Sequence, residues 1–273
     1  MRLVLREFLR QTLPPKVFRR VLAAWRHRFY LPSLTVSIFV KRPPILSGFP
    51  SGRSSDLVSE LRDVNVLAPT EMCRVMNRHG SDKGVGGRHN YTPIYSVLFG
   101  KLRASPLRIF ELGLGSGNPA FAANMGAEGS PGGSLRGWKE LFPNALIYGA
   151  DIDRACLFEE DRIMTFYCDQ LDRVAIDEMW SQPALQGGMD IIVEDGMHTF
   201  EGSVSFLNGS LRMLRPGGVY VIEDVPTRMI SRWQEELETN YSKRYLNLDF
   251  AIVQLPISHN DRDNNLMIIR DRG

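Results

Sequence analysis

The 273-residue sequence has few cysteines and no long apolar run. Its cysteines, Cys73, Cys156 and Cys168, are odd in number, far apart and without a C-x-x-C pair, which favours reduced, buried thiols and a cytoplasmic setting. The longest apolar run near the start, 34–40, falls far short of the roughly 20 residues that cross a bilayer. Arg and Lys interrupt the N-terminal apolar residues throughout, which argues against a secretory signal.

Acidic side chains are almost missing from the first part of the chain. Residues 1–53 hold eleven Lys or Arg and a single acid, Glu7, although the formal net charge of the whole chain is only +2 and indicates no nucleic-acid partner. Helical spacing of apolar residues in 1–30 predicts two basic helices. We expect them to pack on the main domain or on a second copy in a homo-oligomer, or to lie peripherally on an anionic membrane. With a Pro- and Gly-rich linker over 41–56, they form a predicted extension, 1–65.

From residue 66 onward, short apolar runs alternate with helical patterns. Strands are predicted at 107–112, 145–150, 163–167, 190–194 and 218–223, and helices at 69–78, 91–103, 134–142, 171–180 and 200–214. A helix over 228–240 and strands over 247–255 and 265–270 follow. Five parallel βα units and a terminal hairpin predict an α/β fold with a doubly wound, mostly parallel seven-stranded sheet that ends in a C-terminal β-hairpin.

A glycine-rich loop follows the first of these strands. Glu111 and the glycines Gly113, Gly115 and Gly117 fit the pattern E-x-G-x-G-x-G, which is typical of S-adenosylmethionine (SAM) enzymes. Asn118 stands where the dinucleotide pattern G-x-G-x-x-G requires glycine, which disfavours a dehydrogenase. With the strand–helix alternation, the loop predicts a Rossmann-like class I methyltransferase domain over 66–273.

Polar side chains also follow the second and third strands. Asp151 and Asp153 are candidates for hydrogen bonds to ribose hydroxyls, because a carboxylate accepts from two donors. Asp169 and Gln170 could address the adenine amino group. The alternative for these acids is a helix cap or a solvated turn. A Gly- and Ala-rich insertion, 118–133, is expected to lie over the cofactor.

The fourth and fifth strands end in a cluster of acids with one histidine. Asp195, Glu223 and Asp224 are candidate ligands of Mg²⁺ or Mn²⁺, since carboxylates gathered at one sheet edge need a cation between them. His198 is the only strong base candidate nearby, suited to removing a hydroxyl proton near neutral pH. The alternatives are a structural histidine, a helix-capping Asp224 and a Glu223 that supports the ligands from behind.

Several motifs along the chain together resemble one family. These are S-D-K-G at 81–84, H-N-Y-T-P-I-Y at 89–95, S-L-R-G-W at 134–138, D-G-M-H at 195–198 and G-G-V-Y-V-I-E-D at 217–224. Over about 75–270, the sequence resembles the class I SAM-dependent O-methyltransferases that act on sugars, including the macrolide and rhamnosyl sugar enzymes.

The resemblance implies a magnesium-dependent transfer to a sugar hydroxyl, with His198 as base and Asp195 and Asp224 as metal ligands. It also implies that Asp82, Lys83, His89 and Tyr91 line the cofactor and acceptor pocket. Macrolide-type members carry a larger N-terminal portion, where this chain has its basic segment. The resemblance leaves the third metal ligand unassigned.

Three functions are consistent with these residues. The first is SAM-dependent, Mg²⁺-assisted O-methylation of a sugar or glycoconjugate, with a small-molecule or glycan acceptor. The second is methylation of a phenolic or other small-molecule hydroxyl, for which an aromatic slot is expected. The third is a non-catalytic SAM-binding scaffold, against which the set Asp195, His198 and Asp224 argues.

Overall fold

The computed structural model describes residues 44–49, 56–121, 123–126, 130–255 and 260–273. The chain divides into two units, 1–40 and 41–273, and all described residues belong to the second. The two basic helices predicted in 1–30 therefore lie outside the described residues. No helix in the described ranges combines the length and the apolar character that a bilayer crossing requires.

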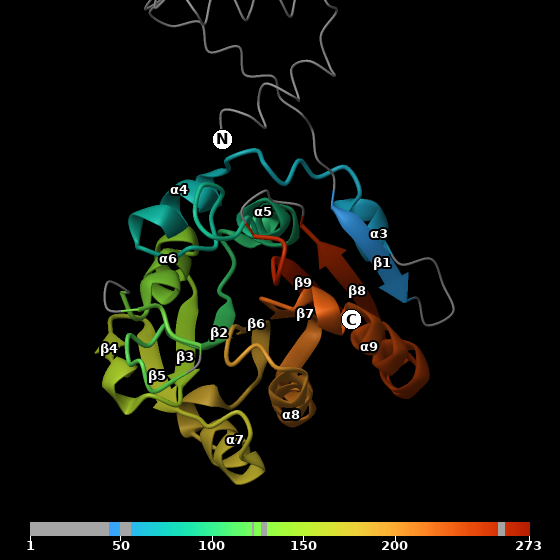
Figure 1. Ribbon diagram of the computed structural model, residues 1–273. Helices are drawn as coiled ribbons and strands as arrows, with labels where there is room; N and C mark the ends of the chain where they lie inside the picture. Colours follow the sequence, from blue (N-terminus) through green and yellow to red (C-terminus); the bar gives the residue numbers. More distant parts are fainter. Residues whose placement is uncertain (1–43, 50–55, 122, 127–129, 256–259) are drawn as a thin grey trace, which may run out of the picture. The chain divides into compact units, whose positions relative to one another are not determined.

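The described chain is built on one mixed sheet of nine strands in the order β1-β8-β9-β7-β6-β2-β3-β5-β4 (Figure 1). In chain order the strands are β1 (Ile45–Phe49), β2 (Arg108–Leu112), β3 (Leu146–Asp151), β4 (Glu159–Glu160), β5 (Ile163–Tyr167), β6 (Met189–Glu194), β7 (Leu214–Ile222), β8 (Leu248–Gln254) and β9 (Asn265–Asp271). Strands β5, β3, β2, β6 and β7 are parallel, and β9 pairs antiparallel with both β7 and β8. The chain runs outward from β2 to β3 and then outward on the other side through β6, so the topological switch lies between β2 and β6.

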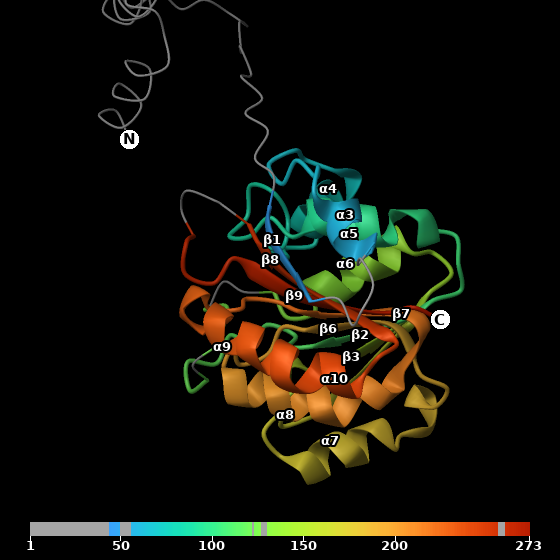
Figure 2. The ribbon, with the colours of Figure 1, turned by 90° about the vertical axis from the view of Figure 1, so that its right-hand side faces the viewer.

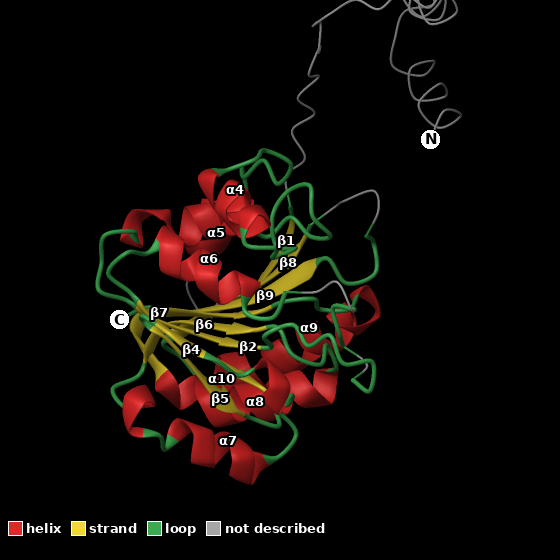
Figure 3. Ribbon diagram, turned by 90° about the vertical axis from the view of Figure 1, so that its left-hand side faces the viewer, coloured by secondary structure: helices red, strands yellow, loops and turns green. Residues whose placement is uncertain are grey.

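Helices cover both faces of the sheet (Figures 2 and 3). On one face lie α3 (Asp56–Leu61), α4 (Glu71–Arg78), α5 (Thr92–Phe99) and α6 (Gly133–Leu141). On the other lie α7 (Arg173–Trp180), α8 (Phe200–Ser210), α9 (Ile230–Glu236) and α10 (Ser242–Arg244). The arrangement leaves the carboxyl ends of the parallel strands as the edge at which a ligand can be held.

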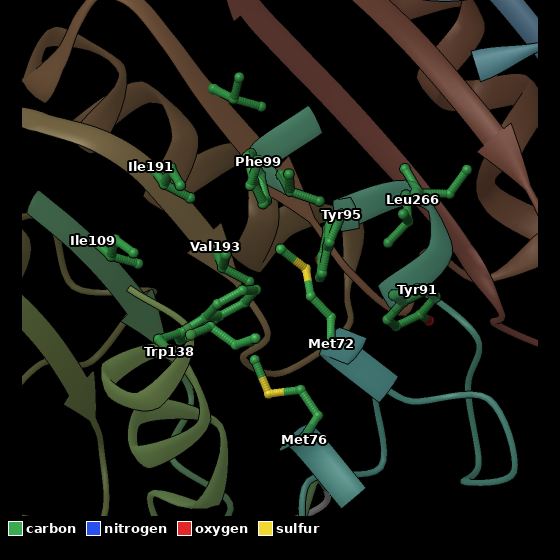
Figure 4. Packing of buried hydrophobic residues seen from close by; sticks show 14 of the residues in the cluster. Met72, Met76, Tyr91, Tyr95, Phe99, Ile109, Trp138, Ile191, Val193 and Leu266 are labelled. Atoms are coloured by element: carbon green, nitrogen blue, oxygen red, sulfur yellow. The ribbon is translucent and has the colours of Figure 1, made fainter. Parts of the chain in front are cut away.

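The alternation of side chains along the strands creates two separate apolar cores. Ile109 and Ile191 point to the α4–α6 face, whereas their neighbours Phe110 and Ile192 point to the α7–α8 face. On the first face, Trp138 of α6 packs among Met72, Met76 and Val193 (Figure 4). Gly137 permits this approach, because a Cβ there would lie 2.5 Å from the Met76 sulfur. The predicted α/β fold is thus confirmed.

Two strands go beyond the seven predicted. β1 lies within 41–56, where a linker was expected, and pairs in register with β8 from Ile45↔Gln254 to Phe49↔Phe250. The Pro and Gly of this segment suggested a linker, but the prolines flank the strand, and a glycine within a strand is typical of close approach by a neighbouring element. The second addition, β4, is a two-residue strand against β5. Predicted helices over 91–103 and 200–214 end earlier, in 3₁₀ turns at Gly100–Leu102 and Leu211–Met213.

Candidate active site

The glycine loop after β2 is shaped by positions that only glycine fills easily. Gly113 and Gly115 have φ of 92° and 84°, in the left-handed region. A Cβ on Gly113 would lie 1.9 Å from the backbone oxygen of Asp195, so the loop touches the end of β6 directly. A Cβ on Gly115 would lie 2.0 Å from the sulfur of Met125, which belongs to the insertion over 118–133. A Cβ on Gly117 would lie 3.2 Å from the backbone oxygen of Gly126.

The insertion is joined to the glycine loop by backbone hydrogen bonds. Met125 donates its N–H to the oxygen of Ser116 at 2.8 Å, and Gly132 donates to Leu114 at 2.7 Å. The described part of the insertion therefore lies against the loop, and its expected role as a cover for the cofactor remains a prediction.

We call the carboxyl ends of β2, β3 and β5 the cofactor side. Here Asp151 is 7% exposed and accepts from the N–H of Leu114 at 2.7 Å and of Asp153 at 2.8 Å. Burial raises the pKa of Asp151, although these donors oppose the shift. Asp153 accepts from Ser116 Oγ at 2.5 Å, and this bond lowers the pKa of Asp153. Asp151 thus fixes the glycine loop, and ribose binding by either acid remains a prediction.

The predicted adenine pair also has internal partners. Gln170 is buried, accepts from the N–H of Met197 at 2.8 Å and donates to Glu194 at 3.1 Å. Asp169 accepts from the N–H of Leu171 at 2.9 Å. Gln170 thereby ties the end of β5 to the loop that carries His198, and adenine recognition by Asp169 and Gln170 stays a prediction.

We call the ends of β6 and β7 the acidic side. Asp195, His198 and Asp224 each offer one ligand atom here, and these atoms lie within 4.8 Å of one another. His198 and Asp224 have φ of 54° and 51°, left-handed values that non-glycine residues rarely adopt and that occur often at functional sites. His198 Nε2 lies 3.7 Å from Asp224 Oδ2, with side-chain exposures of 26% and 13%. The carboxylates of Asp195 and Asp224 fit a divalent cation such as Mg²⁺, and the imidazole of His198 lies beside them.

A buried lysine lies between these acids and the interior. The Lys83 side chain is 2% exposed, and its Nζ donates to Asp195 Oδ2 at 2.5 Å and to Glu223. Glu111 Oε1 lies 3.4 Å away. Burial alone would lower the pKa of Lys83, but Asp195, Glu111 and Glu223 raise it well above its ordinary range, so the ammonium stays charged. Lys83 was expected to line the cofactor and acceptor pocket; the structure pairs it with Asp195 and Glu223 on the acidic side, and cofactor binding by Lys83 stays a prediction.

Two predicted ligand residues are engaged with other groups. Glu111, predicted to bind the cofactor, is fully buried and accepts from Ser134 Oγ at 2.6 Å and from Trp138 Nε1 at 2.5 Å. Glu223, a candidate metal ligand, accepts from Lys83 and from the hydroxyl of Tyr95. Both assignments remain predictions. In this structure each carboxylate is hydrogen-bonded to buried side chains beneath the edge of the sheet.

The segment before α5 supplies a further wall of the site. Tyr91 is buried and donates its hydroxyl to Asp224 Oδ1 at 2.5 Å, and burial together with Asp224 raises its pKa well above the ordinary value. His89 stacks on Tyr91 at 4.8 Å and places Nδ1 3.3 Å from the same Asp224 oxygen. Its Nε2 lies 3.6 Å from Asp82. His89 is thus a second histidine beside Asp224, in the wall of the site as expected, but it is only 3% exposed, and the role of His198 as the base stays a prediction.

Tyr95 is part of the motif at 89–95 but was not predicted as a candidate site residue. Its hydroxyl reaches Glu223 from one turn beyond Tyr91, so the two tyrosines hold the adjacent carboxylates of Glu223 and Asp224. The spacing Y-x-x-x-Y at the start of a predicted helix was the available signal, because residues four apart share one helix face.

No family model matches the chain. It is 33% identical over 190 residues to 8-demethyl-8-alpha-L-rhamnosyl tetracenomycin-C 2'-O-methyltransferase of Streptomyces olivaceus, an alignment covering 70% of this chain and 45% of the relative. It is 37% identical over 143 residues to demethylmacrocin O-methyltransferase of Streptomyces fradiae, covering 52% of this chain and 33% of the relative. The chain thus spans less than half the length of these curated relatives.

A solved structure shares the fold. The MycE methyltransferase of the mycinamycin biosynthetic pathway, in complex with Mg and SAH, is 28% identical with a TM-score of 0.53, covering 75% of this chain and 55% of that one. The sheet order, the glycine loop and these comparisons lead to one assignment. The chain has the Rossmann-like class I methyltransferase fold and is a homologue of sugar O-methyltransferases.

Proposed function

We propose that this protein is a SAM-dependent, Mg²⁺-assisted O-methyltransferase that methylates a hydroxyl group of a sugar or glycoconjugate. The observation that carries the proposal is the group Asp195, His198 and Asp224, gathered within 4.8 Å at the ends of two strands. Gly113 of the cofactor side touches the backbone of Asp195. The predicted donor loop thus adjoins the end of β6, from which the chain continues through Asp195 to the predicted base three residues later.

In this proposal, each residue has a defined task. When bound, SAM supplies the methyl group and Mg²⁺ polarises the acceptor hydroxyl. Asp195 and Asp224 would hold the cation, with Glu223 as a further candidate ligand. His198 takes the hydroxyl proton on Nε2, and Asp224, 3.7 Å away, stabilises the resulting imidazolium. A positioned base contributes about 10²–10⁴ in rate, whereas alignment of two reactants contributes about 7–11 kcal/mol, so positioning is the larger effect.

The names of the relatives support the proposed substrate class. The Streptomyces olivaceus relative is named for a rhamnosyl tetracenomycin 2'-O-methylation, and the MycE methyltransferase was also solved with Mg, SAH and Mycinamycin VI. We propose a sugar hydroxyl on a small-molecule or glycan acceptor for this chain. A phenolic hydroxyl is the alternative acceptor, and a non-catalytic SAM-binding scaffold is the alternative outside enzymes.

One assay separates these functions. Purified protein is incubated with methyl-labelled SAM and Mg²⁺ and offered rhamnosides, other deoxyhexosides, catechols or a glycan extract of the host. The proposal requires labelled methyl ether on a sugar hydroxyl and its loss on addition of EDTA. Methylated catechol without methylated sugar would favour the phenolic alternative, and SAM binding without any product would favour the scaffold.

Membrane contact, oligomeric state, cytoplasmic location and a basic extension ahead of the enzyme domain are also proposals; β1 and α3 belong to the unit that holds the sheet, so the proposed boundary lies before them and not at residue 65. The basic residues of 1–53 support peripheral binding to anionic lipid. Co-sedimentation with phosphatidylserine vesicles at low and high salt tests this, because binding through basic residues weakens as salt is added. Light scattering after gel filtration gives the oligomeric state.

A further inference from the structure

Lys83 connects three strand ends through one ammonium group. Its Nζ lies 2.5 Å from Asp195 Oδ2, donates also to Glu223, and lies 3.4 Å from Glu111 Oε1. Asp195 and Glu223 directly follow β6 and β7, and Glu111 is the penultimate residue of β2; these three strands are neighbours in the sheet. In the described part of the chain, Lys83 is the one side chain that donates a hydrogen bond to the Asp195 carboxylate.

Hydrogen bonds and close packing fix the backbone around Lys83, so its side chain has little freedom to move away from the three carboxylates. The Lys83 oxygen accepts from the N–H of Tyr91 at 3.0 Å and of Thr92 at 3.2 Å, at the start of α5. Gly84 packs tightly on α4, where a Cβ would lie 2.3 Å from Asn77 Oδ1. The 2% exposure of Lys83 leaves no solvated position for the ammonium in this packing.

We propose that Lys83 is a positioning residue of the metal site: by binding Oδ2 of Asp195, it fixes the orientation in which that carboxylate would hold the cation. The inference rests on the proposed function and deepens it. Lys83 does not itself contact the cation or the acceptor. Its contribution is the orientation of a ligand, as supporting partners commonly provide in metal sites.

The charge of Lys83 and its positioning role predict opposite changes in metal affinity when Lys83 is replaced, so the direction of the change distinguishes them. A cation next to a metal site repels the metal, so Lys83→Met should tighten metal binding if only charge matters. Loss of a supporting partner instead weakens metal affinity by about 10–100-fold. We therefore expect Lys83→Met to weaken binding by about tenfold or more, and Lys83→Arg to restore it to within about threefold.

The probe is Mn²⁺ with the full chain at saturating SAH, with free Mn²⁺ quantified from its EPR signal. Glu111→Gln is the matched control, because it removes another Lys83 partner that is not a candidate metal ligand; since Glu111 is a predicted cofactor contact, SAH binding of this variant is measured first and the SAH concentration is set to saturate it. It should leave Mn²⁺ affinity within about threefold of wild type, since partners outside the ligand shell act only through the ligands. If Lys83→Met does not fold, the double variant Lys83→Met/Glu111→Gln takes its place, because it leaves fewer buried carboxylates without a cationic partner. The same loss of Mn²⁺ affinity, about tenfold or more, is then expected of the double variant.

Each outcome decides the proposal. Weaker Mn²⁺ binding in Lys83→Met, with recovery in Lys83→Arg and little change in Glu111→Gln, supports it. Equal or tighter binding in Lys83→Met overturns it, and so does an equal loss in Glu111→Gln, which would indicate general repacking of the buried cluster. Failure of the wild type to bind Mn²⁺ would reject the metal assistance of the proposed function and this inference with it.

Discussion

The cofactor side and the acidic side use carboxylates in different ways, although both lie at the carboxyl edge of one sheet. On the cofactor side, Asp151 is bonded to backbone N–H groups and Asp153 to a hydroxyl and a backbone N–H, so they shape loops. On the acidic side, Asp195 and Asp224 face an ammonium, a phenol and an imidazole. The comparison indicates that the partner, more than the position at the strand end, determines whether an acid supports the backbone or can serve chemistry.

The largest expected effect comes from the acidic side. His198→Ala should lower kcat by about 10²–10⁴-fold, because the proposed hydroxyl deprotonation loses its base. Affinity for SAH, measured by calorimetry, should change little, since His198 belongs to the acidic side alone. Wild-type turnover in His198→Ala would remove this residue from the mechanism, and a large loss of SAH affinity would show that the two sides are not independent.

The contact between the two sides can be broken at Gly113. A Cβ there meets the Asp195 backbone at 1.9 Å, at φ of 92°. Gly113→Ala should destabilise the fold by roughly 2–5 kcal/mol, from left-handed strain and overpacking together. Gly217→Ala is the control, because Gly217 has φ of 76° with nothing within 4 Å of its built Cβ. It should lose only about 1–2 kcal/mol in urea unfolding, and equal losses would mean that the contact is unimportant.

On the cofactor side alone, Asp151→Asn should cost about 1.5–3 kcal/mol of unfolding free energy, the value of hydrogen bonds to a charged group. Asp153→Asn is the comparison, and its loss should be smaller because Asp153 is more exposed. Urea denaturation of both variants gives the two losses. A greater loss in Asp153→Asn would contradict the assignment of Asp151 as the acid that fixes the glycine loop.

The smallest effect concerns Cys168, whose backbone N–H bonds to the oxygen of Asp151. Burial raises the pKa of this thiol from 9.0 to about 12. The folded state therefore holds the thiol proton more tightly than the unfolded state, and this contribution to stability is lost as the pH rises from about 9 toward 12. Cys168→Ala should show a shallower alkaline loss of stability than wild type. Equal slopes in urea unfolding at several alkaline pH values would contradict the shift.

Local patterns predicted most of the fold and the identity of the acidic side. Strand periodicity, the glycine spacing and D-G-M-H lie within short stretches, and the structure places Asp195, His198 and Asp224 together as expected. Local sequence patterns could not predict contacts between residues that lie far apart in the chain. Lys83 meets Asp195 across 112 positions and Glu223 across 140, and no spacing rule encodes such contacts.

The same limit explains the error at β1. A strand of Ile-Leu-Ser-Gly-Phe flanked by prolines resembles a linker until its partner β8, some two hundred residues later, is known. Glu111 illustrates a related limit. Its motif predicted a ligand contact, whereas its burial beneath Trp138 depends on how α6 packs on the sheet.

The edge strand β1 has a practical consequence for anyone who shortens this protein. A version begun at residue 66, where composition alone would place the start of the enzyme domain, would lack β1 and also α3, whose Leu57 and Leu61 are fully buried. The backbone N–H and C=O groups of β8 that now pair with β1 would be left without partners, and such an exposed strand edge can pair with strands of other molecules. Such a truncation should be prone to aggregation, whereas one that retains residues from 44 onward keeps the ladder closed.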